Sequence, residues 1–164
     1  MDANRHSVVL TALLAVAKAS VVLISVVMIC VTLAQVIFRY VIAAPLPWSE
    51  EMARYCFVWI VFLGGAIGLA RGIHLGVDLL VNLLPEPLRR GLEVLTTLLI
   101  GVFAVVVINA SLPVLNMNMF QRSPALGVQM TWIYLAIPIS MGLIALICLE
   151  RIYLILFKTP GAES

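Results

Sequence analysis

The stretch that decides the fold covers residues 39–78 and reads RYVIAAPLPWSEEMARYCFVWIVFLGGAIGLARGIHLGVD. Its centre is apolar and carries no charged side chain between Arg54 and Arg71. As one helix, this run is long enough to cross the ~30 Å hydrocarbon core of a bilayer. Polar clusters flank it on both sides, so it predicts a membrane helix with a separate surface contact at each end.

The composition of the whole chain agrees with this prediction. Of its 164 residues, 63% are hydrophobic and only 11% are charged, whereas a soluble domain has about 25% charged residues. The length allows about four crossings of ~20 residues each. The net charge of +2 gives no electrostatic footprint for nucleic acid. We therefore expect an all-α integral membrane protein.

Four apolar segments predict four tilted crossings within a single membrane domain of residues 1–164, at about 19–38, 50–70, 88–111 and 131–157. The first apolar run extends over residues 8–38, which as a helix is longer than a bilayer core. Either its first turns, residues 8–17, lie along the membrane surface, or the helix tilts strongly. We expect residues 8–17 to be partly interfacial and residues 19–38 to cross. Ala17-Lys18-Ala19 fits a signal-peptide cleavage pattern, but the apolar run continues beyond it, so we expect a membrane helix.

A short amphipathic helix is expected at about 73–84, between the second and third crossings. His74, Asp78 and Asn82 recur every four residues and form one polar stripe, opposite apolar side chains. The segment is too short to span a bilayer. It fits a helix that lies flat in the interface.

The polar residues before the second crossing form the main candidate contact site. Pro45 and Pro47 interrupt the helix there. Ser49 is expected to be the N-cap of the next helix, with Glu50 and Glu51 in its first turn, where the helix dipole favours negative charge. Further pairings are open: Glu50 with Arg54 one turn later, and Arg39 with Glu50 or Glu51. Trp48 and Arg39 could also serve only as anchors at the headgroup level.

Glycines recur every four residues along and just after the second crossing, at Gly64, Gly68 and Gly72. Such a stripe lets another backbone approach closely. The alternative is that glycine is simply frequent in membrane helices.

Three features shape the second half of the chain. Asn109, Ser111 and Pro113 are expected to mark the far end of the third crossing. Residues 115–129 are mixed and predict a short loop with a frayed helical extension. Pro138 lies inside the fourth crossing and removes one backbone donor, so it predicts a kink that Ser140 could help to accommodate.

Lysine and arginine residues are distributed unevenly between the two sides of these crossings. Seven fall on the side of the termini and three on the other: Arg5, Lys18, Arg71, Arg89, Arg90, Arg151 and Lys158 against Arg39, Arg54 and Arg122. Because positive residues favour the cytoplasmic side, both termini are expected to be cytoplasmic.

Enzyme motifs are missing from the sequence. It contains no G-x-S-x-G, H-E-x-x-H or P-loop pattern. Two other functions remain as alternatives. A self-contained small multidrug-type transporter would need a titratable group at membrane depth, and a membrane anchor of a redox enzyme would need intramembrane haem ligands, usually histidine. The crossings supply neither, which favours a non-catalytic scaffold that works with another membrane protein.

Several short motifs, in order over about residues 19–153, resemble those of one known family. They are Phe38-Arg39-Tyr40-Val41, Trp48-Ser49-Glu50-Glu51, Phe62-Leu63-Gly64, Arg71-Gly72-Ile73-His74-Leu75-Gly76-Val77-Asp78, Leu84-Pro85, Ser123-Pro124-Ala125-Leu126 and Tyr134-Leu135-Ala136-Ile137-Pro138. The chain resembles the DctQ-type small membrane subunit of TRAP (tripartite ATP-independent periplasmic) transporters.

The resemblance implies a four-helix subunit in the inner membrane of a bacterium or archaeon. It implies two protein partners: a large membrane subunit, which carries the sodium and substrate sites, and a periplasmic binding protein. This chain itself would hold no cofactor. The implied substrate is an organic acid such as a C4-dicarboxylate or sialic acid. Candidate residues for contact with the large subunit or with lipid are Arg39, Trp48, Glu50, Glu51, Arg54, Gly64, Gly68, Gly72, His74 and Asp78.

Overall fold

The computed structural model describes residues 7–71 and 86–157. These residues form three long helices and one interrupted helix: α1 (Val8–Tyr40), α2 (Pro47–Ala70), α4 (Glu86–Met117), and α5 (Thr131–Tyr134) followed by α6 (Ala136–Phe157). Four helical segments are long and apolar enough to cross a membrane. The predicted all-α membrane fold is therefore confirmed. The proposed interfacial helix at 73–84, with Gly72, His74 and Asp78, lies outside the described residues.

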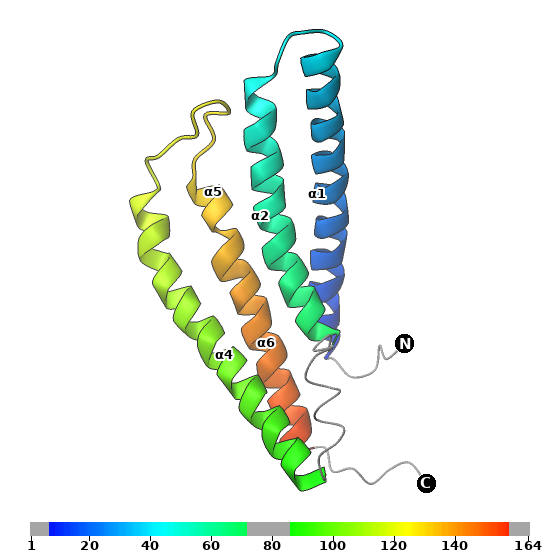
Figure 1. The fold of residues 1–164 in the computed structure, drawn as a ribbon. Coiled ribbons are helices and arrows are strands. Elements are labelled where there is room, and N and C mark those ends of the chain that lie inside the picture. The colour runs from blue at the N-terminus through cyan, green and yellow to red at the C-terminus, as the bar shows by residue number, and fades with distance from the viewer. Residues whose placement is uncertain (1–6, 72–85, 158–164) are drawn as a thin grey trace.

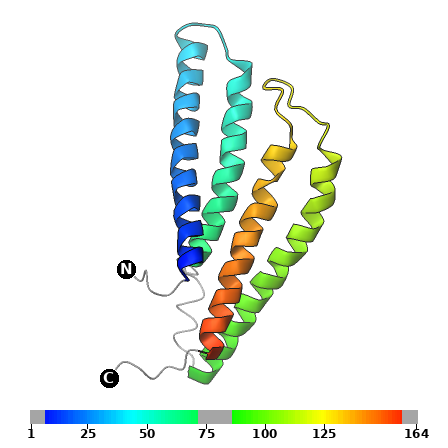
Figure 2. The same cartoon turned by 180° about the vertical axis from the view of Figure 1, so that it is seen from behind.

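The helices form two antiparallel hairpins that lie side by side (Figures 1 and 2). The first hairpin is α1 with α2, and the second is α4 with α5 and α6. The links 41–46 and 118–130 lie at one end of the molecule, called here the loop end. The beginning of α1 and the end of α6 lie at the opposite end, called here the terminal end (Figure 1). Helices α2 and α6 form the main contact between the hairpins.

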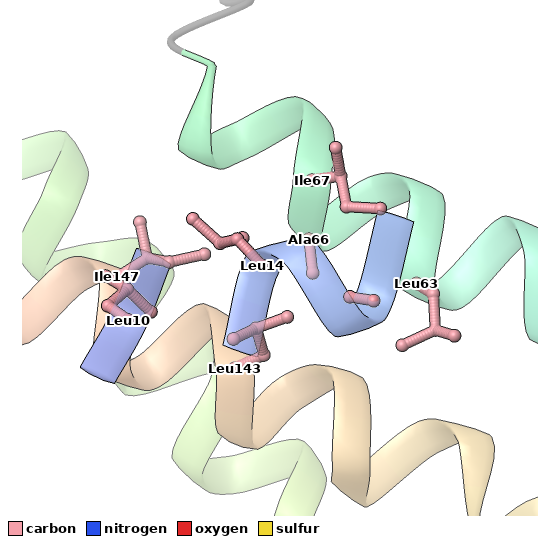
Figure 3. Close-up of a cluster of buried hydrophobic side chains, with 8 residues drawn as sticks. Leu10, Leu14, Leu63, Ala66, Ile67, Leu143 and Ile147 are labelled. Carbon is pink, nitrogen blue, oxygen red and sulfur yellow. The ribbon is translucent and has the colours of Figure 1, made fainter. Parts of the chain in front are cut away.

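A cluster of buried apolar side chains joins the hairpins near the terminal end (Figure 3). The cluster draws on α1, α2 and α6 and contains Leu10, Leu14, Ala17, Leu63, Ala66, Ile67, Leu143 and Ile147. The first turns of α1 are thus part of the bundle and continuous with the rest of that helix. The structure thus shows no break in α1 between the part expected to be interfacial, residues 8–17, and the expected crossing.

The outward faces of the bundle are strongly apolar. On α1 the side chains of Val22, Leu23 and Leu33 are exposed, and on α4 those of Leu99 and Phe103. Burying such faces in lipid or against another membrane protein keeps them from water. The exposed apolar faces of α1 and α4 are therefore suited to contact with lipid and with another membrane protein.

Pro138 breaks the last crossing where its chemistry requires. A proline has no N–H to donate to the carbonyl four residues earlier, and the regular helix is interrupted at Leu135, between α5 and α6. The predicted irregularity is confirmed. Ser140 does not help as expected, because its hydroxyl is buried without a hydrogen-bond partner among the described residues.

Proline acts differently in α4, which passes through Pro113 and ends only at Met117. The expectation that Asn109, Ser111 and Pro113 mark the helix end is wrong. Near Pro113, the side chains of Asn109 and Ser111 donate to the carbonyls of Val105 and Ile108, at 2.9 and 2.7 Å. These local bonds let polar side chains stay within a long apolar helix.

Candidate functional site

The polar residues at the start of α2 lie at the loop end, and the helix begins earlier than predicted. Pro47 is its first residue and Leu46 its N-cap, without a side-chain cap. Proline suits this position because the first helical N–H groups have no intrahelical partner. Ser49 is therefore not the N-cap. Its buried hydroxyl instead donates to the carbonyl of Leu46 at 2.7 Å.

Glu50 faces α1, the other helix of its own hairpin. Its Oε1 lies 4.0 Å from Nη1 of Arg39, and Nε2 of Gln35 donates to the same oxygen at 3.4 Å. Both charged side chains are more than half exposed, so the pair contributes only ~0–1 kcal/mol on its own. The expected proximity of Arg39 to this turn is confirmed, and the geometry assigns Glu50 rather than Glu51 as its partner.

Glu51 faces the second hairpin and accepts three hydrogen bonds through one oxygen. The hydroxyl of Ser123 donates to Oε2 at 2.6 Å, and the backbone amides of Leu126 and Ala125 donate at 3.1 and 3.2 Å. The Ser123 hydroxyl also accepts from the Leu126 amide at 3.2 Å. A carboxylate of the first hairpin thereby holds a loop of the second.

The loop over residues 121–130, called here the 121–130 loop, contains more internal hydrogen bonds than the predicted irregular link would have. The amide of Ser123 donates to the backbone carbonyl of Val128 at 2.9 Å. The amide of Met130 donates to the backbone carbonyl of Gln121 at 3.0 Å. Gly127 adopts a positive φ of 66°, which suits glycine because it has no Cβ. Ser-Pro followed by glycine is a turn signal, so Ser123, Pro124 and Gly127 could have revealed this turn. Nothing in the sequence alone linked it to Glu51.

One turn along α2, a second contact reaches the same region. The hydroxyl of Tyr55 lies 3.6 Å from the sulfur of Met130, where the loop ends. Tyr55 follows Glu51 by four residues, so both lie on one face of α2. This face contacts the second hairpin at the loop end.

The two hairpins are also joined at the terminal end. Oε1 of Glu150, near the end of α6, accepts a hydrogen bond from the backbone amide of Ser7. Ser7 is the N-cap of α1, so the carboxylate lies where the helix dipole favours negative charge. Carboxylates therefore connect the hairpins at both ends of the molecule.

The other candidate residues have different surroundings. Trp48 is 38% exposed, and Arg54 is exposed on α2. A Cβ atom added at Gly64 or Gly68 would meet nothing within 4 Å, so no described part of this chain packs closely on either glycine. Within residues 7–71 and 86–157, the space next to both glycines is therefore not filled by a neighbouring helix.

No group of three or more His, Cys, Asp or Glu side chains that could hold a metal ion occurs within residues 7–71 and 86–157. The cysteines are free: Cys56 and Cys148 are buried in the bundle and Cys30 is exposed. The chemistry of the described site is therefore that of hydrogen bonding and ion pairing at a helix-bundle surface.

Residues 28–158 match a family profile described as "Tripartite ATP-independent periplasmic transporters, DctQ component". The chain belongs to the DctQ family. Three relatives illustrate its range. This DctQ-family chain is 35% identical over 102 residues to the C4-dicarboxylate TRAP transporter small permease protein DctQ of Rhodobacter capsulatus, covering 60% of this chain and 44% of the relative.

It is 26% identical over 128 residues to the sialic acid TRAP transporter small permease protein SiaQ of Vibrio cholerae, covering 77% of this chain and 73% of the relative. It is also 31% identical over 109 residues to the sialic acid TRAP transporter permease protein SiaT of Haemophilus influenzae. That match covers 66% of this chain but only 18% of SiaT. A segment similar to this chain is thus part of a much longer permease there.

Membership of the family decides between the functions that the sequence left open. This DctQ-family chain is a multi-pass membrane protein, the small permease subunit of a TRAP transporter. It is a transport protein and not an enzyme. The family description names a tripartite, ATP-independent periplasmic transporter and one component of it. The multidrug-type transporter and the redox anchor are therefore set aside.

Proposed function

We propose that this chain is the non-transporting small subunit of a sodium-driven importer of organic acids that depends on a binding protein. In this proposal it braces the large subunit, which carries the sodium and substrate sites, and its loop end forms part of the surface on which the binding protein docks. The named substrates of its relatives, C4-dicarboxylates and sialic acid, support the substrate class.

The observation that carries this proposal is the distribution of charge. No Asp, Glu, Lys, Arg or His occurs at residues 19–38, 55–70, 94–117 or 131–149, which form the central parts of the crossings. Coupling to an ion gradient at membrane depth usually uses such groups. A chain without them needs a partner that supplies them.

The open faces of the bundle support the bracing role. A Cβ atom at Gly64 or Gly68 would meet no atom of the described residues within 4 Å. Close helix packing in membranes relies on such small residues because lipid provides no hydrophobic drive between helices. We propose the large subunit as the occupant of this stripe. The joining of a similar segment to a longer permease in SiaT supports this choice.

The proposed orientation has the terminal end in the cytoplasm of a bacterium or archaeon and the loop end in the periplasm. The seven-to-three distribution of Lys and Arg supports it.

In the same proposal, residues 73–84 lie flat on the cytoplasmic surface. Spin labels at Val77 and Leu80 should then be shielded from water while one at Asp78 is wet, and equal water access at all three would contradict the interfacial helix.

The deciding experiment is reconstitution in liposomes with an inward sodium gradient and either labelled succinate, a C4-dicarboxylate, or labelled sialic acid. Uptake is expected only when this chain, the large subunit and the loaded binding protein are all present. Leaving out each component in turn provides the controls. Sodium-dependent uptake by this chain alone would overturn the proposal.

A further inference from the structure

The 121–130 loop belongs to the second hairpin, but part of it is held by a side chain of the first. The amide of Ala125 donates only to Glu51 among the described residues, and the amide of Leu126 donates to Glu51 and to Ser123. Pro124 has no amide to donate. The amides of Ala125 and Leu126 therefore depend on Glu51. The rest of the loop closes on itself, through the Gly127 amide and the Ser123 carbonyl at 3.0 Å and through the Met130–Gln121 bond at its base.

The same arrangement presents the rest of the loop outward. Ser123 is 3% exposed and points to Glu51. Most other loop residues are exposed: Gln121, Arg122, Pro124, Ala125, Gly127, Val128 and Gln129. Nη1 of Arg122 donates to the carbonyl of Gly127 at 3.3 Å, so its charge is also oriented. The loop is an ordered surface supported from beneath by one carboxylate.

From this geometry we infer that Glu51 is a positioning residue that fixes the 121–130 loop in the conformation that meets the periplasmic binding protein. This inference rests on the proposed function, which assigns the loop end to the docking surface. The binding protein is the soluble partner that the tripartite family implies. Ordering a mobile loop upon binding reduces affinity, and a loop that is already ordered avoids this cost.

The role differs from that of the neighbouring Glu50. Glu50 contacts Arg39 and Gln35 of α1, which belongs to its own hairpin. Glu51 reaches across a sequence separation of 72 residues to Ser123. Substituting each by glutamine removes one negative charge at adjacent positions and leaves an uncharged amide oxygen. Only the substitution at Glu51 weakens the hydrogen bonds that hold the loop, because charge-assisted hydrogen bonds are stronger than neutral ones.

The first measurement is amide hydrogen exchange in the complex of the full-length chain with its large subunit in nanodiscs. Glu51→Gln should accelerate exchange at Ala125 and Leu126 by several-fold and leave the α2–α6 core protected. Glu50→Gln should leave exchange at both amides unchanged. Ser123→Ala should reproduce part of the effect, and its combination with Glu51→Gln should be less than additive because both weaken the same contact.

The second measurement is uptake into liposomes at increasing concentrations of loaded binding protein. Glu51→Gln should raise the half-saturating concentration by several-fold and leave the maximal rate within about twofold, since loop order affects encounter rather than the transport step. Glu93→Gln is the control for lost charge. Glu93 lies on α4 toward the terminal end, and uptake should be as in the unsubstituted chain.

Unchanged exchange at Ala125 and Leu126 in Glu51→Gln would overturn the positioning role. Faster exchange with an unchanged half-saturating concentration would overturn the link to docking. If the unsubstituted complex takes up nothing with all three components present, the proposed function fails instead. Exchange is measured without transport, so the two failures are distinguishable.

Discussion

The hydroxyl of Ser123 donates a 2.6 Å hydrogen bond to the carboxylate of Glu51, and this contact joins the two helical hairpins at the loop end. At the opposite end, Glu150 accepts from the amide of Ser7. Between them, α2 packs on α6 through apolar side chains. Hydrogen bonds to carboxylates thus tie the two hairpins together at both ends, which agrees with the bracing role proposed above.

The Arg39–Glu50 pair should matter for assembly more than for folding. Arg39→Glu places like charges together at the loop end and should reduce co-purification with the large subunit. In the same chain, Glu50→Arg should restore part of it, because the pair is regenerated with its signs exchanged. Since the pair is exposed, the folding free energy of the chain should change by no more than ~1 kcal/mol.

The control for this exchange is Glu51→Arg with Arg39→Glu. Glu51 contacts the 121–130 loop, so this combination should not restore assembly. Restoration by Glu51→Arg and not by Glu50→Arg would contradict the assigned pairing. Normal assembly and uptake in Arg39→Glu alone would show that neither process needs the pair.

Gly68→Leu should weaken association with the large subunit more than it weakens the fold of this chain. A Cβ atom at Gly68 meets nothing within 4 Å among the described residues, but a leucine side chain there would hold a partner helix away. The measurements are the subunit ratio after affinity purification and the thermal unfolding of the isolated chain in detergent.

Gly101→Leu is the matched control, because a Cβ there lies 3.5 Å from Cβ of Cys148 on α6. Overpacking this contact should cost about 1–3 kcal/mol of folding free energy. Gly101→Leu should therefore lower folding stability more than association, and Gly68→Leu should lower association more than folding stability. Equal loss of folding stability in both would contradict an open face at Gly68.

Leu14→Ala should destabilise the chain. Leu14 is 5% exposed in the cluster that joins α1, α2 and α6, and the cavity left there should cost on the order of 2 kcal/mol. Leu23→Ala removes the same atoms from a side chain that is 66% exposed and should change stability little. Unfolding of both variants by a denaturing detergent titration compares them, and equal effects would count against the observed packing of α1.

The orientation can be tested with a reporter enzyme that is active only outside the cytoplasm. Fused after Ala162 it should be inactive, and fused near Gln121 it should be active, because positive residues favour the terminal end as the cytoplasmic side. Western blots of both fusions control for expression. The reverse pattern would contradict the model with both termini inside.

The sequence by itself determined the class of this protein. Apolar runs long enough for a bilayer, with few charged residues, allow only helices that satisfy their own backbone groups. The break near Pro138 and the interruption between α1 and α2 were also predictable, because proline acts through local covalent geometry. The ordered motifs pointed to the DctQ family for the same reason: they are local features that can be read along the chain.

Only the tertiary structure decided which residues meet. Glu50 and Glu51 are adjacent and chemically alike, yet successive residues of a helix point in different directions, so one faces α1 and the other the 121–130 loop. No local pattern shows that Ser123 contacts that carboxylate, since the contact depends on how the two hairpins pack. Ser49 likewise departed from its expected role as a cap, because its hydroxyl donates to the carbonyl of Leu46 instead. Helix α4 also continues past Pro113 to Met117.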